Sequence, residues 1–163
     1  MNEQLENRNL SEVLPLIPPK QAKAMLPIST AAAELVLRTR RAIRDVLHGR
    51  DRRRMVVIVG PCSLHDPEAA LDYAERLRRA TVGSEADLIV LMRAYFEKPR
   101  TTVGWKGLIN DPRLDGSCEV AEGLVLARQL LLRINEMGLP CATELLDPVT
   151  PQYTADLLSW AAI

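Results

Sequence analysis

The sequence predicts an α/β fold built on a parallel sheet, and two observations support this. Short apolar runs rich in β-branched residues alternate with amphipathic segments of helical period along residues 55–163. Strands and helices that alternate in this way are joined by helical crossovers, so the strands run parallel. The unusual polar residues follow the apolar runs, where parallel folds gather their ligand-binding groups. A doubly wound sheet and a (β/α)8 barrel both fit.

The composition is that of one globular domain. The chain has 163 residues, 47% of them hydrophobic, and its 21 Lys+Arg balance its 21 Asp+Glu. This balance leaves no global field to recruit nucleic acid or an acidic membrane. We expect no secretory signal and no membrane span, because no apolar run approaches the required ~20 residues. Three widely spaced cysteines predict reduced thiols and a cytoplasmic protein.

Residues 1–50 are expected to form an N-terminal arm followed by a helix. Residues 1–28 are polar and then rich in proline, which predicts little regular structure. Ser29 and Thr30 can cap a helix that reaches about His48 and ends at Gly49. Its apolar side is expected to contain Leu35, Val36, Ile43, Val46 and Leu47. The nearby arginines lack interleaved aromatic residues, which favours a solvated helix face over a nucleic-acid site.

Residues 51–163 contain three expected strand–helix units. The strands are MVVIVG (55–60), LIVLMRAY (88–95) and CATELLD (141–147), and the first should be buried on both faces. Asp66 and Pro67 can begin the first helix, and Ser117 can cap a second that reaches about Met137 and stops at Gly138. The inner stripe of that second helix is expected to be Val120, Leu124, Ala127, Leu131 and Ile134.

The third helix and the end of the chain complete this pattern. Thr150 can be the N-cap and Pro151 the first helical residue, with an inner stripe of Tyr153, Leu157 and Trp160. The chain ends at Ile163, where a fourth strand should be starting. We therefore expect residues 51–163 to be the first part of a larger fold, truncated at the start of its fourth strand.

The loop after the first strand contains Cys62 in the sequence GPCSLHD. Taken alone, Cys62 is somewhat more easily interpreted as a small buried residue in a tight turn. The alternative is a nucleophile or a metal ligand at the edge of the sheet, with His65 as a neighbour. No further ligand with recognisable spacing is present, so the residues alone do not complete a metal site. Cys141 is expected in the core, and the position of Cys118 is uninformative.

The loop after the second strand, RAYFEKPRTTVGWKGL, is rich in cations and hydroxyl groups. Arginine and lysine side chains with nearby threonine hydroxyls are suited to phosphate binding. The candidates here are Arg93, Lys98, Arg100, Thr101 and Thr102. A surface loop with scattered charges is the competing interpretation, but the flanking Tyr95, Phe96, Val103 and Trp105 should anchor the loop. No P-loop motif is present. In the third strand, Glu144 and Asp147 are acid/base candidates or salt-bridge partners of these cations.

Three segments carry a family resemblance: VVIVGPCSLHDP, MRAYFEKPRTTVGWKGLINDP and TELLDPVTPQY…ADLLSW. They resemble the microbial type I 3-deoxy-D-arabino-heptulosonate 7-phosphate (DAHP) synthases, the class inhibited by Phe, Tyr or Trp. The resemblance implies a (β/α)8 TIM barrel with an N-terminal extension. It also implies condensation of phosphoenolpyruvate with erythrose 4-phosphate and loss of phosphate, the first step of the shikimate pathway. A divalent metal of the Mn, Fe, Co or Zn type is implied as cofactor, and homo-oligomers as the assembly.

The resemblance assigns roles to individual residues. It implies that Cys62 is a metal ligand, and that Arg93 and Lys98 are catalytic residues that contact phosphoenolpyruvate. Arg100 and Thr101 would receive the phosphate of erythrose 4-phosphate. Pro151 and Gln152 would lie near an allosteric site for an aromatic amino acid.

One departure from the family pattern affects the expected activity. The family's other metal ligands (a His, a Glu and an Asp) belong to the second half of the barrel and are absent from this sequence. We therefore expect the 163-residue chain to be inactive alone. The alternative is a truncated, non-catalytic paralogue that acts as a regulatory or oligomerisation module.

Overall fold

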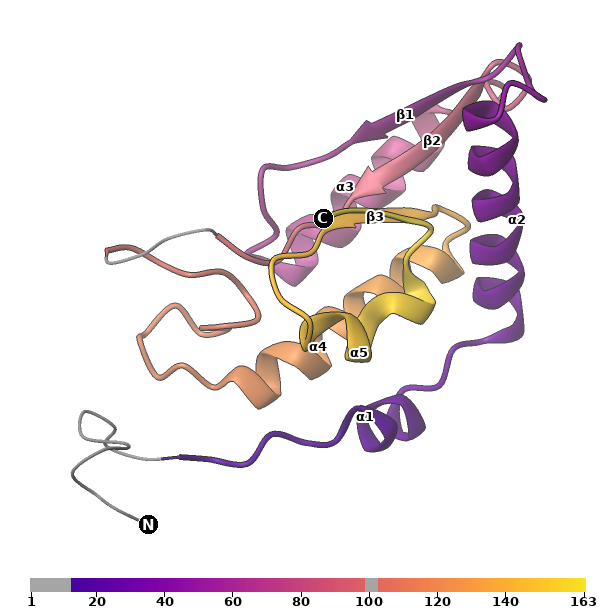
Figure 1. Ribbon diagram of the computed structural model, residues 1–163. Helices are drawn as coiled ribbons and strands as arrows, with labels where there is room; N and C mark the ends of the chain where they lie inside the picture. Colours follow the sequence, from indigo (N-terminus) through magenta and orange to yellow (C-terminus); the bar gives the residue numbers. More distant parts are fainter. Residues whose placement is uncertain (1–12, 99–102) are drawn as a thin grey trace.

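A computed structural model describes residues 13–98 and 103–163 (Figure 1). One sheet of four parallel strands has the order β1-β2-β3-β4. The strands are β1 (Met55–Val59), β2 (Leu88–Arg93), β3 (Cys141–Glu144) and β4 (Trp160–Ala162). The helices are α1 (Pro19–Met25), α2 (Thr30–Leu47), α3 (Pro67–Ala80), α4 (Val120–Glu136), α5 (Thr150–Thr154) and the 3-10 turn η1 (Ala155–Leu157). The predicted α/β class with a parallel sheet is confirmed.

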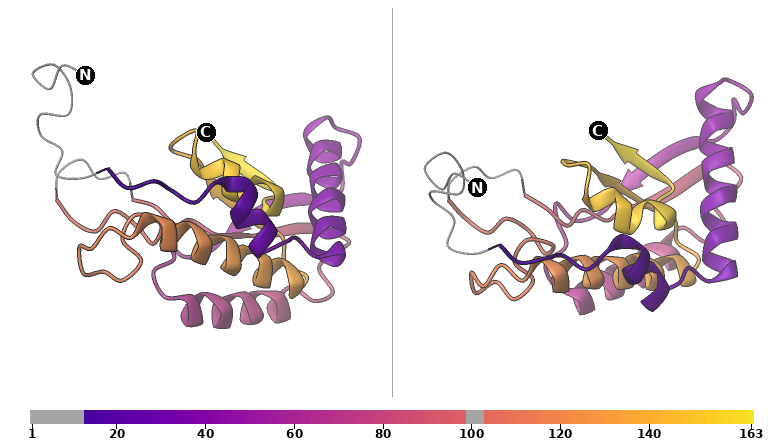
Figure 2. Two further views of the ribbon diagram at one scale, coloured as in Figure 1. Left: turned by 90° about the horizontal axis from the view of Figure 1, so that it is seen from below. Right: turned by 60° about the horizontal axis from the view of Figure 1, so that its bottom comes forward.

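The hydrophobic core lies between the sheet and two helices. Figure 2 shows α3 and α4 along one face of the sheet, with α2 standing across one end of the strands. The main cluster joins Met92 and Cys141 of the sheet to Ala74 of α3 and Leu131 of α4. A smaller cluster on the other face packs Ile43, Ile89, Leu91 and Ala142 together, so α2 also covers part of that face.

Strand β1 is less buried than expected. Met55, Ile58 and Val59 are 65%, 42% and 37% exposed, so the prediction of burial on both faces is wrong. Among the described strands β1 pairs only with β2, from Met55↔Leu88 to Val59↔Met92, and therefore lies at an edge. An apolar run does not distinguish an edge strand from a central one, because both can be equally β-branched.

Several helix boundaries agree with the sequence prediction. The Ser29 hydroxyl accepts a hydrogen bond from the Ala32 backbone N–H and caps α2. The Asp66 carboxylate accepts from two backbone N–H groups at the start of α3. Gly138 follows α4 with a φ of 85°, a left-handed conformation that glycine adopts without strain. On α2, Leu35, Val36 and Ile43 are buried as predicted, but Leu47 is exposed.

The N-terminal part is more regular than predicted. Residues 19–25 form α1, which begins at Pro19, where a proline costs no hydrogen bond. Ala22 on this helix is only 1% exposed and belongs to the main core. Tertiary packing therefore stabilises a helix that the proline-rich sequence concealed.

Two predicted N-caps are wrong. Helix α4 begins at Val120 rather than after Ser117, whose backbone N–H donates to the Asp115 carboxylate. Thr150 is the first residue of α5, and its backbone N–H donates to Asp147 Oδ1 at 2.8 Å. At α5 the Asp147 carboxylate accepts this hydrogen bond, as carboxylates readily do in such turns. At α4 the Asp115 carboxylate bonds within the preceding turn, and the N-cap residue Glu119 makes no side-chain capping hydrogen bond.

The end of the chain also differs from the prediction. Strand β3 ends at Glu144, and the third helix is short, with α5 passing directly into η1. Tyr153 and Leu157 are buried as expected, but Trp160 is 41% exposed and lies in β4 rather than in a helix.

A buried arginine joins the N-terminal segment to the rest of the fold. Arg128 on α4 is 1% exposed and donates hydrogen bonds to the Leu26 and Tyr153 carbonyls and to both carboxylate oxygens of Asp156. The Tyr153 hydroxyl in turn donates to the Ile17 carbonyl at 2.5 Å. In the part of the chain that the structure describes, no helix is long and apolar enough to cross a membrane.

Candidate active site

The site is built where β1 and β2 end side by side. Their parallel register places Val59 beside Met92, so Gly60 follows β1 directly next to Arg93. A Cβ atom on Gly60 would lie 2.5 Å from the Arg93 carbonyl oxygen, which no ordinary contact allows. A glycine at this position therefore permits the loop that carries Cys62 to approach the end of β2.

Three predicted site residues meet at this edge. The Arg93 guanidinium donates to the Pro61 carbonyl at 2.9 Å and also to the Cys62 carbonyl. Lys98 Nζ lies 3.1 Å from the Cys62 sulfur, to which it donates a hydrogen bond. Arg93 also lies 3.7 Å from the carboxylate of Glu144, the last residue of β3. The carboxyl ends of β1, β2 and β3 therefore converge on one set of charged side chains.

Tyr95 supports this arrangement through its ring and its backbone carbonyl. Its ring lies 4.7 Å from the Arg93 guanidinium carbon, a cation–π geometry. Its carbonyl accepts a 2.7 Å hydrogen bond from the Leu64 backbone N–H, which ties the loop after β1 to the loop after β2. The sequence indicated Tyr95 only as an apolar anchor, and its contact with Arg93 was not predicted. The spacing could have indicated this contact, because Tyr95 follows Arg93 by two residues and side chains two apart lie on one face of an extended chain.

The cation-rich loop folds back on itself, and its two arms are joined by backbone contacts. Lys98 N–H donates to the Lys106 carbonyl at 2.9 Å, and Glu97 bridges to Gly107 in antiparallel pairing. Gly107 has a φ of 113°, and a Cβ there would lie 2.3 Å from the Phe96 carbonyl oxygen. The glycine is thus required for the two arms of the loop to pack together.

The predicted apolar anchors of this loop are mostly confirmed. Tyr95 and Phe96 are buried, and the Trp105 ring N–H donates to the Asp111 carbonyl at 2.8 Å. Val103 is 83% exposed, so its prediction as an anchor is wrong. Arg100, Thr101 and Thr102 lie outside the described residues.

The pKa values of the acidic groups around the site are shifted in different directions. Burial, reinforced by the negative charge of Asp147, raises the pKa of Glu97. The pKa of Asp147 lies below its usual value. Partial burial acts to raise it, but hydrogen bonds from Thr150 and from the Val149 backbone have the larger, opposite effect. Burial and the nearby Glu144 raise the pKa of Tyr95, so its hydroxyl stays protonated. Of Glu97 and Asp147, Glu97 is therefore the one that takes up a proton more readily.

The other candidate residues lie away from this centre. Cys141 is fully buried in the core, where desolvation raises the pKa of its thiol, and Cys118 is exposed ahead of α4. The imidazole of His65 packs against the edge of the Trp105 ring, with 6.4 Å between ring centroids. Pro151 and Gln152 lie on α5, whose start is capped by Asp147.

The donor set for a metal ion is incomplete in the described part of the chain. Cys62 offers an exposed sulfur at the edge of the sheet, a ligand suited to zinc, iron and related ions. Among the described residues, no group of three or more His, Cys, Asp and Glu side chains could hold a metal. This region fits the supply of one ligand and not of a whole site.

Comparison with known proteins identifies relatives of this chain. The model of the DAHP synthetase I family matches residues 25–163. A phospho-2-dehydro-3-deoxyheptonate aldolase from Amycolatopsis methanolica is 53% identical over 163 residues, which is 100% of this chain and 80% of the relative. The Tyr-sensitive enzyme of Escherichia coli K12 is 51% identical over 159 residues, covering 98% of this chain and 44% of that protein.

A solved structure gives the same result for the fold. The phospho-2-dehydro-3-deoxyheptonate aldolase of Francisella tularensis SCHU S4 superposes with a TM-score of 0.90 at 48% identity, covering 95% of this chain and 45% of the other. The chain therefore spans less than half the length of this protein and of the Escherichia coli enzyme. Its four parallel strands and their helices are consistent with part of a TIM barrel. From the family model and these relatives together, the chain belongs to the DAHP synthetase I family.

Proposed function

We propose that the protein containing this chain condenses phosphoenolpyruvate with erythrose 4-phosphate to form DAHP and release phosphate. The observation that carries this proposal is the meeting of Cys62, Arg93 and Lys98 at the carboxyl ends of β1 and β2. The two cations are suited to an anionic substrate, and the neighbouring sulfur is suited to a metal ion. The names of the relatives support the same reaction.

Arg93 and Lys98 would bind phosphoenolpyruvate. Arg93 is oriented by the Pro61 and Cys62 carbonyls and by the Tyr95 ring, so its fork is preorganised for a carboxylate or a phosphate. Lys98 adds a point charge within reach of the same space. Holding such donors in place before the substrate arrives avoids the cost of orienting them during the reaction.

Arg100 and Thr101 would receive the phosphate of erythrose 4-phosphate. The motif in which they stand supports this, since they follow Lys98 by two and three residues in the same loop. The two phosphorylated substrates would then be held by neighbouring parts of one cation-rich loop. Such proximity brings the enol carbon of one substrate close to the aldehyde of the other.

Cys62 would be one metal ligand, with the remaining ligands outside the described residues. A divalent ion bound there would polarise the aldehyde carbonyl as a Lewis acid. The Lys98 ammonium donates a hydrogen bond to the Cys62 sulfur, so a metal ion at Cys62 would lie close to the cation proposed to bind phosphoenolpyruvate. In the condensation, C3 of phosphoenolpyruvate forms a bond to the aldehyde carbon, water adds at C2, and phosphate leaves.

An aromatic amino acid would regulate the protein. Relatives are named Tyr-, Phe- and Trp-sensitive, which supports regulation of this kind. Pro151 and Gln152 would line or adjoin the inhibitor site, and both lie on α5, where Gln152 is exposed.

Steady-state kinetics of the full-length protein tests the assignment of the two substrates. Arg93→Ala should chiefly raise the KM for phosphoenolpyruvate, and Arg100→Ala should chiefly raise the KM for erythrose 4-phosphate. Loss of a charge-assisted contact to a buried anion costs about 2–5 kcal/mol, or roughly 30-fold or more in kcat/KM. Equal effects of both variants on both substrates would contradict separate pockets.

Metal dependence tests the role of Cys62. Removing metal from the wild type with a chelator should abolish activity, and added divalent metal should restore it. Cys62→Ala should be inactive even with added divalent metal. Cys118→Ala is the matched control, because Cys118 is also exposed but lies outside the site. Full activity of Cys62→Ala with added metal would refute the ligand role.

A further inference from the structure

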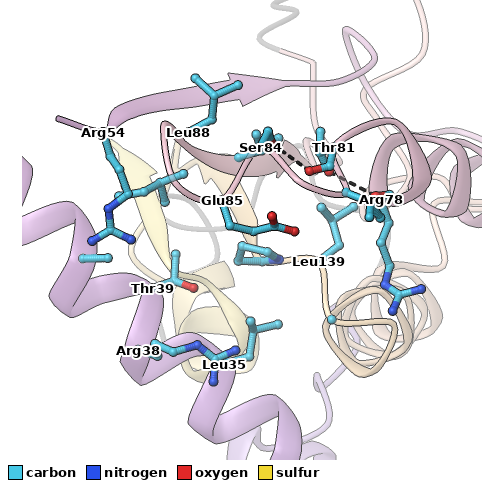
Figure 3. Close-up of a pocket in the computed structure, with 16 residues that line it drawn as sticks. Leu35, Arg38, Thr39, Arg54, Arg78, Thr81, Ser84, Glu85, Leu88 and Leu139 are labelled. Carbon is cyan, nitrogen blue, oxygen red and sulfur yellow. Dashed lines mark hydrogen bonds between the residues drawn. The ribbon is translucent and has the colours of Figure 1, made fainter.

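A cleft lies at the opposite end of the sheet from Cys62. It has a volume of about 390 Å³ and lies between α2, the α3–β2 connection and the segment before β3 (Figure 3). Arg54, which directly precedes β1, and Pro140, which directly precedes β3, both line it. The five residues of β1 therefore separate this cleft from the active-site loops, a span of roughly 17 Å. A molecule bound here would not contact the residues assigned to substrate binding.

The rim of the cleft is positively charged. Arg38, Arg54 and Arg78 come from three separate segments, and Glu85 is the one acidic side chain among the lining residues. Arg54 is paired through Nε with Asp51 at 2.6 Å. Among the described residues, no carboxylate lies within ion-pair distance of Arg38 or Arg78. Two of the three cations are therefore available to an anion.

The floor of the cleft is apolar. Leu35 and Ile89 are each 7% exposed and Leu139 is 3% exposed, and all three line it. Thr39 lies among them on the inner face of α2 at 6% exposure, and Figure 3 shows its hydroxyl directed into the cleft. A merely solvated charged surface would not combine unpaired cations with a recessed apolar floor and a hydroxyl. A volume in the range of about 300–1,000 Å³ is typical of small-molecule sites.

We propose that this cleft binds a small organic anion, with a carboxylate or phosphate head at Arg38 and an apolar body on the Leu35–Leu139 floor. The guanidinium supplies a fork that matches the planar head group, and Thr39 supplies a further donor. The apolar body is required to use the floor, so an inorganic anion should bind more weakly. Glu85 opposes the anion electrostatically and keeps its affinity moderate. The site is independent of the catalytic residues, and its ligand would act on the reaction only from a distance.

Benzoate is a suitable probe, because it joins a carboxylate to an apolar ring. Calorimetry on the full-length protein should detect benzoate binding that weakens as salt is added, with inorganic phosphate weaker and benzyl alcohol weaker still. If phosphate bound as tightly as benzoate, the charged head group alone would account for the affinity. That result would refute a contribution from the apolar floor. Equal binding of benzyl alcohol would refute the role of the arginines.

Arginine modification locates the bound probe. Benzoate should protect Arg38 from phenylglyoxal, as read by peptide mass spectrometry, and should leave Arg44 unprotected. Arg44 is the matched control, because it is exposed on the same helix but does not line the cleft. Equal protection of both residues, or of neither, would overturn the proposal.

Two substitutions at exposed positions give opposite expected effects. Arg38→Gln should weaken benzoate binding about tenfold, the usual effect of losing a charge-assisted hydrogen bond. Glu85→Gln should tighten it roughly two- to fivefold by removing a nearby like charge. Arg44→Gln should change it little. Weakening by Glu85→Gln, or equal losses in Arg38→Gln and Arg44→Gln, would contradict the assignment. These titrations need no substrate, so their outcome does not depend on whether the proposed condensation is correct.

Discussion

Replacing Arg128 by methionine should destabilise the protein more than removing any exposed charge. The Arg128 guanidinium donates at 2.8 Å to the Leu26 carbonyl, at 2.8 Å to the Tyr153 carbonyl, and at 2.8 and 2.9 Å to Asp156. These four hydrogen bonds join the segment before α2 to α5 and η1. Methionine keeps the apolar stem of the side chain but supplies no donor.

The expected loss can be estimated from burial. Removing one partner of a buried ion pair costs about 3–5 kcal/mol. Arg128 itself is 1% exposed, but Asp156 is 30% exposed and Lys23 lies 3.9 Å from it. Water and Lys23 therefore partly compensate the carboxylate that is left behind. We expect the free energy of unfolding to fall by about 3 kcal/mol, the lower end of that range.

Urea unfolding of the full-length protein, followed by circular dichroism, measures this loss. Arg133→Met is the matched control, since Arg133 is exposed on the same helix, and it should change stability by less than about 0.5 kcal/mol. A loss below about 1 kcal/mol in Arg128→Met, or equal losses in the two variants, would refute the reasoning.

The pair should also show a specific pH dependence. Partial burial raises the pKa of Asp156, but the hydrogen bonds and charge of Arg128 outweigh it, so the pKa in the folded protein lies below its ordinary value. Stability from this pair is thus present above the unfolded-state pKa and is lost as pH falls through the folded-state pKa. The difference between wild type and Arg128→Met should therefore shrink in acid. A difference that is constant with pH would show that packing, not the ion pair, is lost.

Two further predictions concern the active-site loops. Gly60→Ala would place a Cβ 2.5 Å from the Arg93 carbonyl oxygen, so it should cost about 1–3 kcal/mol and raise the KM for phosphoenolpyruvate; an unchanged KM would show that the geometry at Arg93 does not depend on this close approach. Glu97→Gln should raise the melting temperature at pH 7 but not at pH 3. Burial and the charge of Asp147 raise the pKa of Glu97, so its ionisation costs stability as pH rises past the unfolded-state pKa. An equal gain at both pH values would contradict this cause.

Local patterns predicted the main elements well, because the interactions that begin and end them are local. Ser29 and Asp66 cap the helices that follow them, and the alternation of strands and helices is as expected. One error arose where neighbouring residues competed for one role. Asp147 rather than Thr150 caps α5, and the two candidates differ only in which side chain reaches the free N–H groups.

The sequence by itself determined the parallel α/β class, the loops that carry the polar residues, and the motifs that indicate the family. Only the tertiary structure decided that Lys98 contacts the Cys62 sulfur and that Arg128 is buried rather than solvated. Arg128 lies four residues after Leu124 on the inner stripe of α4, a position that could have indicated burial, but its partners come from distant segments. Helical period and capping depend on residues within one turn of each other. Contacts between loops depend on strand register and on the packing of distant segments, which no local pattern specifies.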